Sequence, residues 1–244
     1  MAEGTRVAMW SGPRNISTAM MYSFDNRPDC FATDEPLYAN YLLSTKTAHP
    51  DADEVIDHYE TDLKSIISHL TGPIPDDMPV WYQKHMSHHV AEDADLDWLD
   101  GLTNCFLIRD PREVLLSLSN VTDVVNLWVM GLPQQVRILS HVVETTGKEP
   151  PIIDARDALE DPVGMLSALC ACLEIEYMDE MVSWDPGPRD CDGIWAKHWY
   201  ASVWKSAGFS PYTPREGQLS PEHDSVLKEA IPLYDEMWSR RLGA

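Results

Sequence analysis

The sequence predicts an α/β fold with three layers, in which helices cover both faces of a central, mostly parallel sheet. Short apolar segments alternate with longer segments of helical periodicity along the 244 residues. In 162–173, for example, Val163, Leu166 and Leu169 recur at helical spacing and mark one helix face as core. With 44% apolar residues, a chain of this length can bury the core of one domain spanning residues 1–244.

Strand and helix signals follow one another in the order that a parallel sheet requires. Strands are predicted at Arg6–Trp10, Cys30–Asp34, Val80–Lys84, Cys105–Arg109 and Pro151–Ala155. Helices are predicted at Ser17–Asn26, Pro36–Leu43, Glu54–Leu70, Pro111–Asn120, Pro133–Glu144, Pro162–Leu173 and Pro221–Arg241. Stretches rich in proline, glycine or aspartate, at Gly72–Pro79 and Trp184–Gly193, are typical of loops.

The first strand runs through a turn directly into a helix. The turn holds Gly12, Pro13 and Arg14, and the helix begins near Ser17 and Thr18. Backbone N–H groups at a helix start have no intrahelical partner, and the helix dipole adds partial positive charge there. With the arginine and the two hydroxyls, this junction predicts a site for a phosphate or sulfate group. It does not match the kinase-type loop G-x-x-x-x-G-K-[ST], and a purely structural corner is the alternative.

A second strand-to-helix junction has Arg109 at the end of its strand. Asp110 is the predicted N-cap, Pro111 the first helical residue, and Glu113 takes the capping-box position. Ser117 follows Asp110 by about two helical turns, so it lies on the same face and can share a small anion with Arg109. The pattern is also typical of a stable structural corner.

Together the two junctions resemble the signatures of the sulfotransferases that use 3′-phosphoadenylyl sulfate (PAPS), a family with a P-loop-containing α/β fold. The order departs from the family's first signature, because Ser11-Gly12 precedes Pro13-Arg14. The resemblance implies that PAPS is the co-substrate, that 3′,5′-ADP is a product and that no metal is needed. It also implies that Arg109 and Ser117 bind the 3′-phosphate. The residues implied to hold the 5′-phosphosulfate are Gly12, Pro13, Arg14, Asn15, Ile16, Ser17 and Thr18.

Sulfuryl transfer needs a general base for the acceptor hydroxyl and cations near the transferring group. Glu35 lies just past the second predicted strand, at the sheet edge where ligand crevices form in α/β proteins. In family branches similar to protein-tyrosine and trehalose sulfotransferases, a glutamate at this place is the base, so the resemblance implies this role for Glu35. Asp34 is the fallback, and capping of the following helix is the structural alternative.

The segment Trp81–His89 resembles the K-T-H segment that follows the third strand in cytosolic members of the family. Lys84 matches the lysine that contacts the transferring group. The family's histidine base can be matched to His85, His88 or His89, because His85 is one residue closer to the lysine than in the family. A histidine, with an ordinary pKa of about 6.5, suits a base at neutral pH. Three clustered histidines also permit a metal site, but no acidic or thiol ligand accompanies them at clear spacing.

The segment 195–209 combines aromatic residues and lysines around Gly208. Family members close the cofactor site with a basic, glycine-containing loop near the C-terminus. The resemblance therefore implies a contact from Lys197 or Lys205 to the 3′-phosphate. Packing of the aromatic residues on the core, with both lysines in water, is the alternative.

Composition restricts the partners. The net charge of −22, from 18 basic and 40 acidic residues, argues against nucleic acid and anionic membranes as partners, and it predicts that basic residues gather at the anion site. The five cysteines are odd in number and lack paired metal-ligand spacing, so we expect them to be reduced. The lack of an apolar leader and of a membrane-length apolar run predicts a cytoplasmic protein.

The resemblance implies transfer of a sulfuryl group to a hydroxyl of a small-molecule acceptor. Two alternatives stay open. One is a P-loop kinase for small molecules, which would need a P-loop lysine and a magnesium carboxylate. The other is a catalytically silent nucleotide-binding or interaction protein. No motif identifies the acceptor or sets an oligomeric state.

Overall fold

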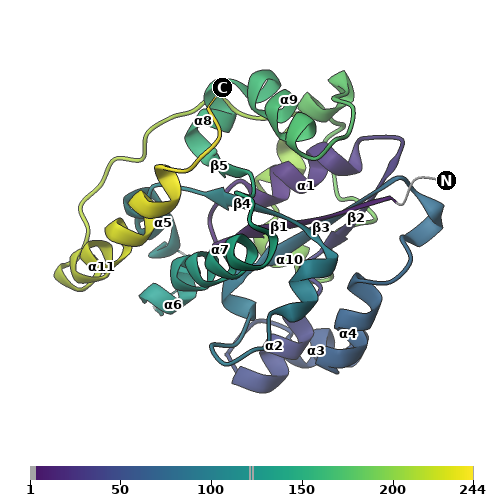
Figure 1. The fold of residues 1–244 in the computed structure, drawn as a ribbon. Coiled ribbons are helices and arrows are strands. Elements are labelled where there is room, and N and C mark those ends of the chain that lie inside the picture. The colour runs from purple at the N-terminus through teal and green to yellow at the C-terminus, as the bar shows by residue number, and fades with distance from the viewer. Residues whose placement is uncertain (1–3, 121, 123, 244) are drawn as a thin grey trace.

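The computed structural model describes residues 4–120, 122 and 124–243. Five parallel strands form one sheet in the order β2-β3-β1-β4-β5, with helices on both sides (Figure 1). The predicted three-layer α/β fold is confirmed. The strands are β1 (Thr5–Ser11), β2 (Cys30–Asp34), β3 (Val80–Met86), β4 (Thr103–Ile108) and β5 (Ile152–Asp154). The helices are α1 (Ser17–Asp25), α2 (Tyr38–Thr45), α3 (Ala52–His58), α4 (Leu63–Leu70), α5 (Pro111–Leu118), α6 (Leu127–Met130), α7 (Leu132–Thr146), α8 (Ala155–Glu160), α9 (Pro162–Cys172), α10 (Ala196–Trp199) and α11 (Pro221–Trp238).

Each face of the sheet has its own core, because successive strand residues point to opposite sides. Val7 and Met9 of β1 pack with buried residues of α1 and α9 on one face. Ala8 and Trp10 pack with buried residues of α4 and α7 on the other. The strand order changes direction at β1, which pairs with β3 on one side and β4 on the other. A ligand crevice is therefore expected outside the carboxyl end of β1.

Helix α11 lies against α5 and α7 at one end of the sheet (Figure 1). It spans 18 residues, and Ser220 caps its start by accepting the N–H of His223. Only Ala230 and Met237 are buried in it, so most of its surface is solvated. Across the part of the chain that the structure describes, no helix is both long and apolar enough to span a bilayer.

The single helix predicted over Glu54–Leu70 is wrong, since the structure has two helices there, α3 and α4. Tyr59 is extended, with φ −108° and ψ 158°. The Glu60 carboxylate then accepts the N–H groups of Thr61 and Asp62, and Asp62 caps the second helix. Side-chain hydrogen bonds to the backbone thus outweigh the continuous apolar periodicity.

Several strand bounds differ from the prediction, most by one or two residues, and two of the differences change the local structure. The third strand continues past Lys84 to Met86, which places His85 inside the strand. The fifth strand stops at Asp154, because that carboxylate accepts the N–H of Arg156 and caps a short helix, α8, that the sequence did not reveal. The first of these differences bears directly on the choice of catalytic base.

Candidate active site

A cavity of about 360 Å³ lies at the carboxyl ends of β1, β2, β3 and β4. Most of the predicted site residues line it, although they come from segments far apart in the sequence. The predicted residues in its lining are Pro13, Arg14, Asn15, Ile16, Ser17, Thr18, Glu35, Lys84, His88, Arg109 and Ser117. His89, the third histidine considered as the base, lines it too. The other polar or aromatic lining residues include Tyr38, Trp195, Trp199, Tyr200 and Arg215.

The start of helix α1 is open toward an anion. Its N-cap residue, Ile16, has no side chain that could accept a backbone N–H, and no hydrogen bond in the described residues uses the N–H groups of Ser17, Thr18 or Ala19. Helix α5, by contrast, is closed by its N-cap, Asp110. Because uncapped N–H groups at a helix start attract negative charge, the cavity wall formed by α1 is a ready anion site.

The β1–α1 turn is held against α6 by a close backbone contact at Gly12. A Cβ on Gly12 would lie 2.2 Å from the carbonyl oxygen of Met130. Only glycine therefore fits, although Gly12 itself does not line the cavity. Arg14, which does line the cavity, has a left-handed backbone with φ 58°, which non-glycine residues adopt at a cost.

We expect Gly12→Ala to lower the free energy of unfolding by about 1–3 kcal/mol, because the new methyl group must displace the Met130 backbone. Chemical denaturation would measure it. Gly243→Ala is the control, since nothing lies within 4 Å of a Cβ at that position. Wild-type stability of Gly12→Ala would contradict this account of the turn.

Three arginines gather at one end of the cavity. Arg14 Nε donates to Ser117 Oγ at 3.0 Å, and Arg109 Nη1 donates to the Arg14 carbonyl oxygen at 3.2 Å. Burial lowers the pKa of Arg14, and the positive charges of Arg215 and Arg109 lower it further. Like charges gathered without a matching number of carboxylates indicate a site built for a multiply charged anion.

Glu113 is the carboxylate of this cluster, and it holds two of its members in place. Its Oε2 accepts from Arg109 Nη2 at 2.7 Å, and its Oε1 accepts from Tyr212 OH at 2.6 Å and from the Arg215 N–H at 3.4 Å. Burial opposes ionisation of Glu113, but the bonds from Tyr212 and Arg109 outweigh it and lower its pKa. Glu113 thus links helix α5 to the segment before α11.

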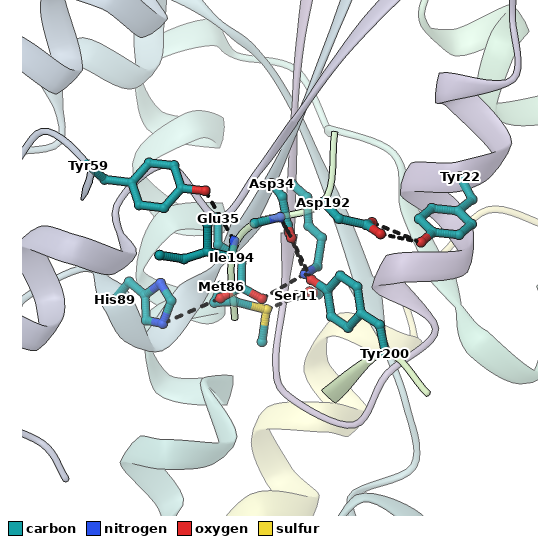
Figure 2. Close-up of polar contacts among 12 residues, drawn as sticks. Ser11, Tyr22, Asp34, Glu35, Tyr59, Met86, His89, Asp192, Ile194 and Tyr200 are labelled. Atoms are coloured by element: carbon teal, nitrogen blue, oxygen red, sulfur yellow. Dashed lines mark hydrogen bonds and ion pairs between the residues drawn. The ribbon is translucent and has the colours of Figure 1, made fainter. Parts of the chain in front are cut away.

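At the other end of the cavity, the buried Lys84 ammonium contacts polar groups of Asp34, Glu35 and Tyr200, which Figure 2 labels. Its Nζ donates to Asp34 Oδ1 at 2.8 Å, to Glu35 Oε1 at 2.7 Å and to Tyr200 OH at 2.6 Å. Asp34 and Lys84 are register partners on β2 and β3, which explains their contact. Burial disfavours the charge of Lys84, but Asp34 and Glu35 outweigh it and hold its pKa well above the usual value.

Glu35 has two features of a reactive carboxylate. Its backbone is left-handed, with φ 41°, in the position directly after β2. Burial raises its pKa, and this effect outweighs the lowering by Lys84. A carboxylate with a raised pKa is a stronger base than an exposed one, and strained backbones concentrate at functional sites.

His88 and His89 lie in a short turn, η2 (Ser87–His89), and both line the cavity. Burial lowers the pKa of His88 to about 4, and it lowers the pKa of His89 well below the usual value. The His89 ring stacks on Tyr38, and its Nε2 lies 4.0 Å from Glu35 Oε2 (Figure 2). Both rings are therefore neutral at neutral pH. Within the described ranges no group of three or more histidine, cysteine or acidic side chains is arranged to hold a metal ion.

His85 does not line the cavity. Because β3 continues through it, His85 points to the sheet face opposite Lys84 and stacks on Trp10, with ring centroids 4.3 Å apart. Its Nε2 lies 3.2 Å from Gln83 Oε1, and burial lowers its pKa to about 3. We therefore leave His85 out of the candidate catalytic residues.

The two lysines predicted near the C-terminus also lie outside the cavity lining. Lys197 is exposed and forms ion pairs with Asp51 at 2.7 Å and Glu54 at 3.1 Å, so two surface carboxylates already balance its charge. Lys205 is exposed, at the end of η5 (Val203–Lys205). The basic residue that the C-terminal region does bring to the cavity is Arg215.

Sequence reasoning missed Arg215 and Tyr200. Arg215 stands two residues before Gly217 in the segment that leads to α11. This basic residue near a glycine could have been matched to the basic, glycine-containing loop that the family resemblance implies. Tyr200 lies just after α10 and gave no signal, because a tyrosine in an aromatic segment is usually core. Asn15 is a different case: its side chain donates to the Leu107 carbonyl oxygen and accepts the Ile16 N–H, so only its backbone is free for a ligand.

A second cavity, of about 320 Å³, adjoins the first and shares Arg109 with it. Its lining is mostly charged and includes Asp154, Arg156 and Tyr212. The Arg156 guanidinium lies over the Tyr212 ring, 5.2 Å from its centroid. The two cavities together extend from β2 to β5 across the carboxyl edge of the sheet.

A family model described as a sulfotransferase domain matches residues 5–241. The chain is 35% identical over 237 residues to branched-chain-amino-acid aminotransferase-like protein 1 of Arabidopsis thaliana, covering 96% of this chain and 42% of that protein. It is 33% identical over 226 residues to protein 2 of the same name and organism, covering 93% of this chain and 40% of that protein. The chain thus spans less than half the length of these relatives.

Solved structures with the same fold include a sulfotransferase from Alicyclobacillus acidocaldarius, with a TM-score of 0.58, 9% identity, and coverage of 98% of this chain and 97% of that one. The sulfotransferase domain of the Synechococcus PCC 7002 olefin synthase has a TM-score of 0.52 at 12% identity, covering 93% and 95%. The sulfotransferase domain from the curacin biosynthetic pathway has a TM-score of 0.51 at 13% identity, covering 93% and 97%. At these identities the likeness establishes a shared fold.

Proposed function

Because the chain belongs to the sulfotransferase domain family, we propose that it transfers a sulfuryl group from PAPS to a hydroxyl of a small-molecule acceptor. The observation that carries the proposal is the division of one cavity into two ends. One end gathers three arginines, and the other holds a buried lysine and glutamate. A donor with phosphates at one end and a reacting group at the other fits this division.

In this proposal the anionic groups of the donor are held by helix α1 and the arginine cluster. The N–H groups of Ser17 and Thr18, together with Arg14, hold the 5′-phosphosulfate. Arg109, Ser117 and Arg215 hold the 3′-phosphate. The second cavity, which shares Arg109, takes the adenosine, with Tyr212 and Arg156 beside the base. Each assignment uses a residue that lines one of the two cavities.

The transfer itself is an in-line displacement at sulfur. The acceptor oxygen forms a bond to sulfur, and the bond from sulfur to the bridging phosphate oxygen breaks, its electron pair going to that oxygen. Glu35 takes the acceptor's proton, and Lys84 faces the oxygens on which negative charge develops. The products are a sulfate ester and 3′,5′-ADP. No metal is assigned a role.

Calorimetric titration separates this proposal from a small-molecule kinase. We expect 3′,5′-ADP to bind with a measurable heat and Mg-ATP to bind far more weakly, because the β1–α1 turn lacks the lysine that a triphosphate requires. Tight binding of Mg-ATP without a response to 3′,5′-ADP would replace the proposal with the kinase alternative.

A further inference from the structure

The three hydrogen bonds of Lys84 Nζ use all three of its N–H groups. A donor's sulfuryl group can therefore receive a hydrogen bond from Lys84 only if one present partner gives its bond up. Which partner is released follows from how firmly each is held.

Asp34 and Tyr200 are each held by further bonds. Asp34 Oδ2 accepts from Tyr200 OH at 2.7 Å and from the Gly193 N–H at 3.1 Å. The side chains of Asp34 and Lys84 are each only 1% exposed. Asp34, Tyr200 and Lys84 thus form a closed triangle of hydrogen bonds. Figure 2 labels two of its members, Asp34 and Tyr200.

Glu35 is the loosest of the three partners. Its side chain is 12% exposed, and Lys84 is its one side-chain hydrogen-bond partner among the described residues. Its second oxygen is 4.0 Å from His89 Nε2, beyond hydrogen-bond distance (Figure 2). Releasing Glu35 therefore breaks one bond, whereas releasing Asp34 or Tyr200 would disturb the whole triangle.

We propose that Asp34 and Tyr200 are positioning residues, which hold Lys84 Nζ in place while its third hydrogen bond passes from Glu35 to the sulfuryl oxygens of the bound donor. This inference rests on the proposed function. It assigns a role to the segment 193–200, which contributes Gly193 and Tyr200 to the triangle from a distant part of the chain. In this proposal Asp34 and Tyr200 act through Lys84 and do not themselves contact the sulfuryl group.

The exchange couples donor binding to the base. Once Lys84 faces the sulfuryl group, Glu35 loses its nearest positive charge, so its pKa rises and the carboxylate becomes a stronger base. Activity requires ionised Glu35 and therefore falls as the pH decreases through that pKa. The titratable groups that face Glu35 are Lys84 on β3, Asp34 on β2, Tyr38 on α2, His89 on η2 and Tyr200 after α10.

The test compares Tyr200→Phe with Tyr59→Phe. Each variant removes one hydroxyl near the segment 193–200. Tyr59 OH accepts the Ile194 N–H at 3.2 Å (Figure 2), and among the described residues no hydrogen bond joins it to Lys84. We expect Tyr200→Phe to lower kcat about 10- to 100-fold, because a misplaced ammonium stabilises the transition state poorly. The dissociation constant of 3′,5′-ADP stays within about twofold, because the arginine end of the cavity is untouched. Tyr59→Phe keeps the kcat of the wild type.

The pH profile of kcat separates positioning from a structural role. Without Tyr200 OH, Lys84 stays with Glu35 in the donor complex, so the pKa of Glu35 stays lower than in the wild-type donor complex. We therefore expect the acid limb of the profile to move to lower pH in Tyr200→Phe. Asp34→Asn is expected to move it the same way, and there the loss of a negative charge that raises the pKa of Glu35 adds to the shift. An unmoved acid limb in both variants, or an equal loss of kcat in Tyr59→Phe, would overturn the inference. Failure of the wild type to bind 3′,5′-ADP would instead overturn the proposed function on which it rests.

Discussion

Glu35→Gln is expected to lower kcat about 10²- to 10⁴-fold, the usual contribution of a general base. The amide keeps the shape of the side chain and can still accept a hydrogen bond from Lys84, but it cannot take the acceptor's proton. The dissociation constant of 3′,5′-ADP is expected to stay within about twofold, because Glu35 lies at the opposite end of the cavity from the arginines. Steady-state kinetics and calorimetry on the same preparation measure both quantities.

Three further variants make this result specific. Glu60→Gln is the matched control: the same chemical change on an exposed side chain that caps local N–H groups, expected to leave kcat unchanged. His88→Gln and His89→Gln test the competing bases. A large loss of kcat in either histidine variant, together with near-normal turnover by Glu35→Gln, would transfer the role of base to that histidine.

Arg215→Met is expected to weaken 3′,5′-ADP binding about 10- to 100-fold, the loss of one or two hydrogen bonds to a charged group. The ligand-free protein is expected to melt at the wild-type temperature or above it. The second expectation follows because Arg215 lowers the pKa of Arg14 by repulsion, and its removal relieves that repulsion. Opposite effects on binding and on stability are typical of residues placed for function.

Arg112→Met is the control for this prediction. Arg112 Nη2 donates to the Gly217 carbonyl oxygen at 2.8 Å, so it contacts the same segment as Arg215 but does not line the cavity. Its removal is expected to change the affinity for 3′,5′-ADP by less than about threefold, an effect of loop support alone. If both arginine variants weakened binding equally, the loop and not a direct phosphate contact would be responsible.

The two strand-to-helix junctions could be predicted from sequence because their signals are local. Asp110 and Pro111 mark the start of α5 within a few residues, and the structure has that helix beginning at Pro111. The β1–α1 turn is equally local, and α1 begins at Ser17 as predicted. Both junctions lie next to β1, where the strand order changes direction, so their residues share one cavity.

Residues that reach the site from long connections could not be predicted in this way. Tyr200 meets Asp34 across 166 positions of sequence, and Tyr212 meets Glu113 across 99. Such contacts depend on how the segments after α9 fold back, which no short pattern encodes. The place of His85 could not be predicted for a different reason. The third strand continues two residues past its predicted end, so His85 lies inside it and points to the sheet face opposite Lys84, since successive strand residues alternate sides.

The proposed sulfuryl transfer is tested most directly by measuring turnover of PAPS labelled on sulfur in the presence of a panel of hydroxylated small molecules. We predict that label appears as a sulfate ester on at least one acceptor, with one 3′,5′-ADP formed per ester, and that Glu35→Gln suppresses both products together. Absence of ester and of 3′,5′-ADP with every acceptor, from a protein that binds 3′,5′-ADP, would favour a catalytically silent nucleotide-binding protein and contradict the account.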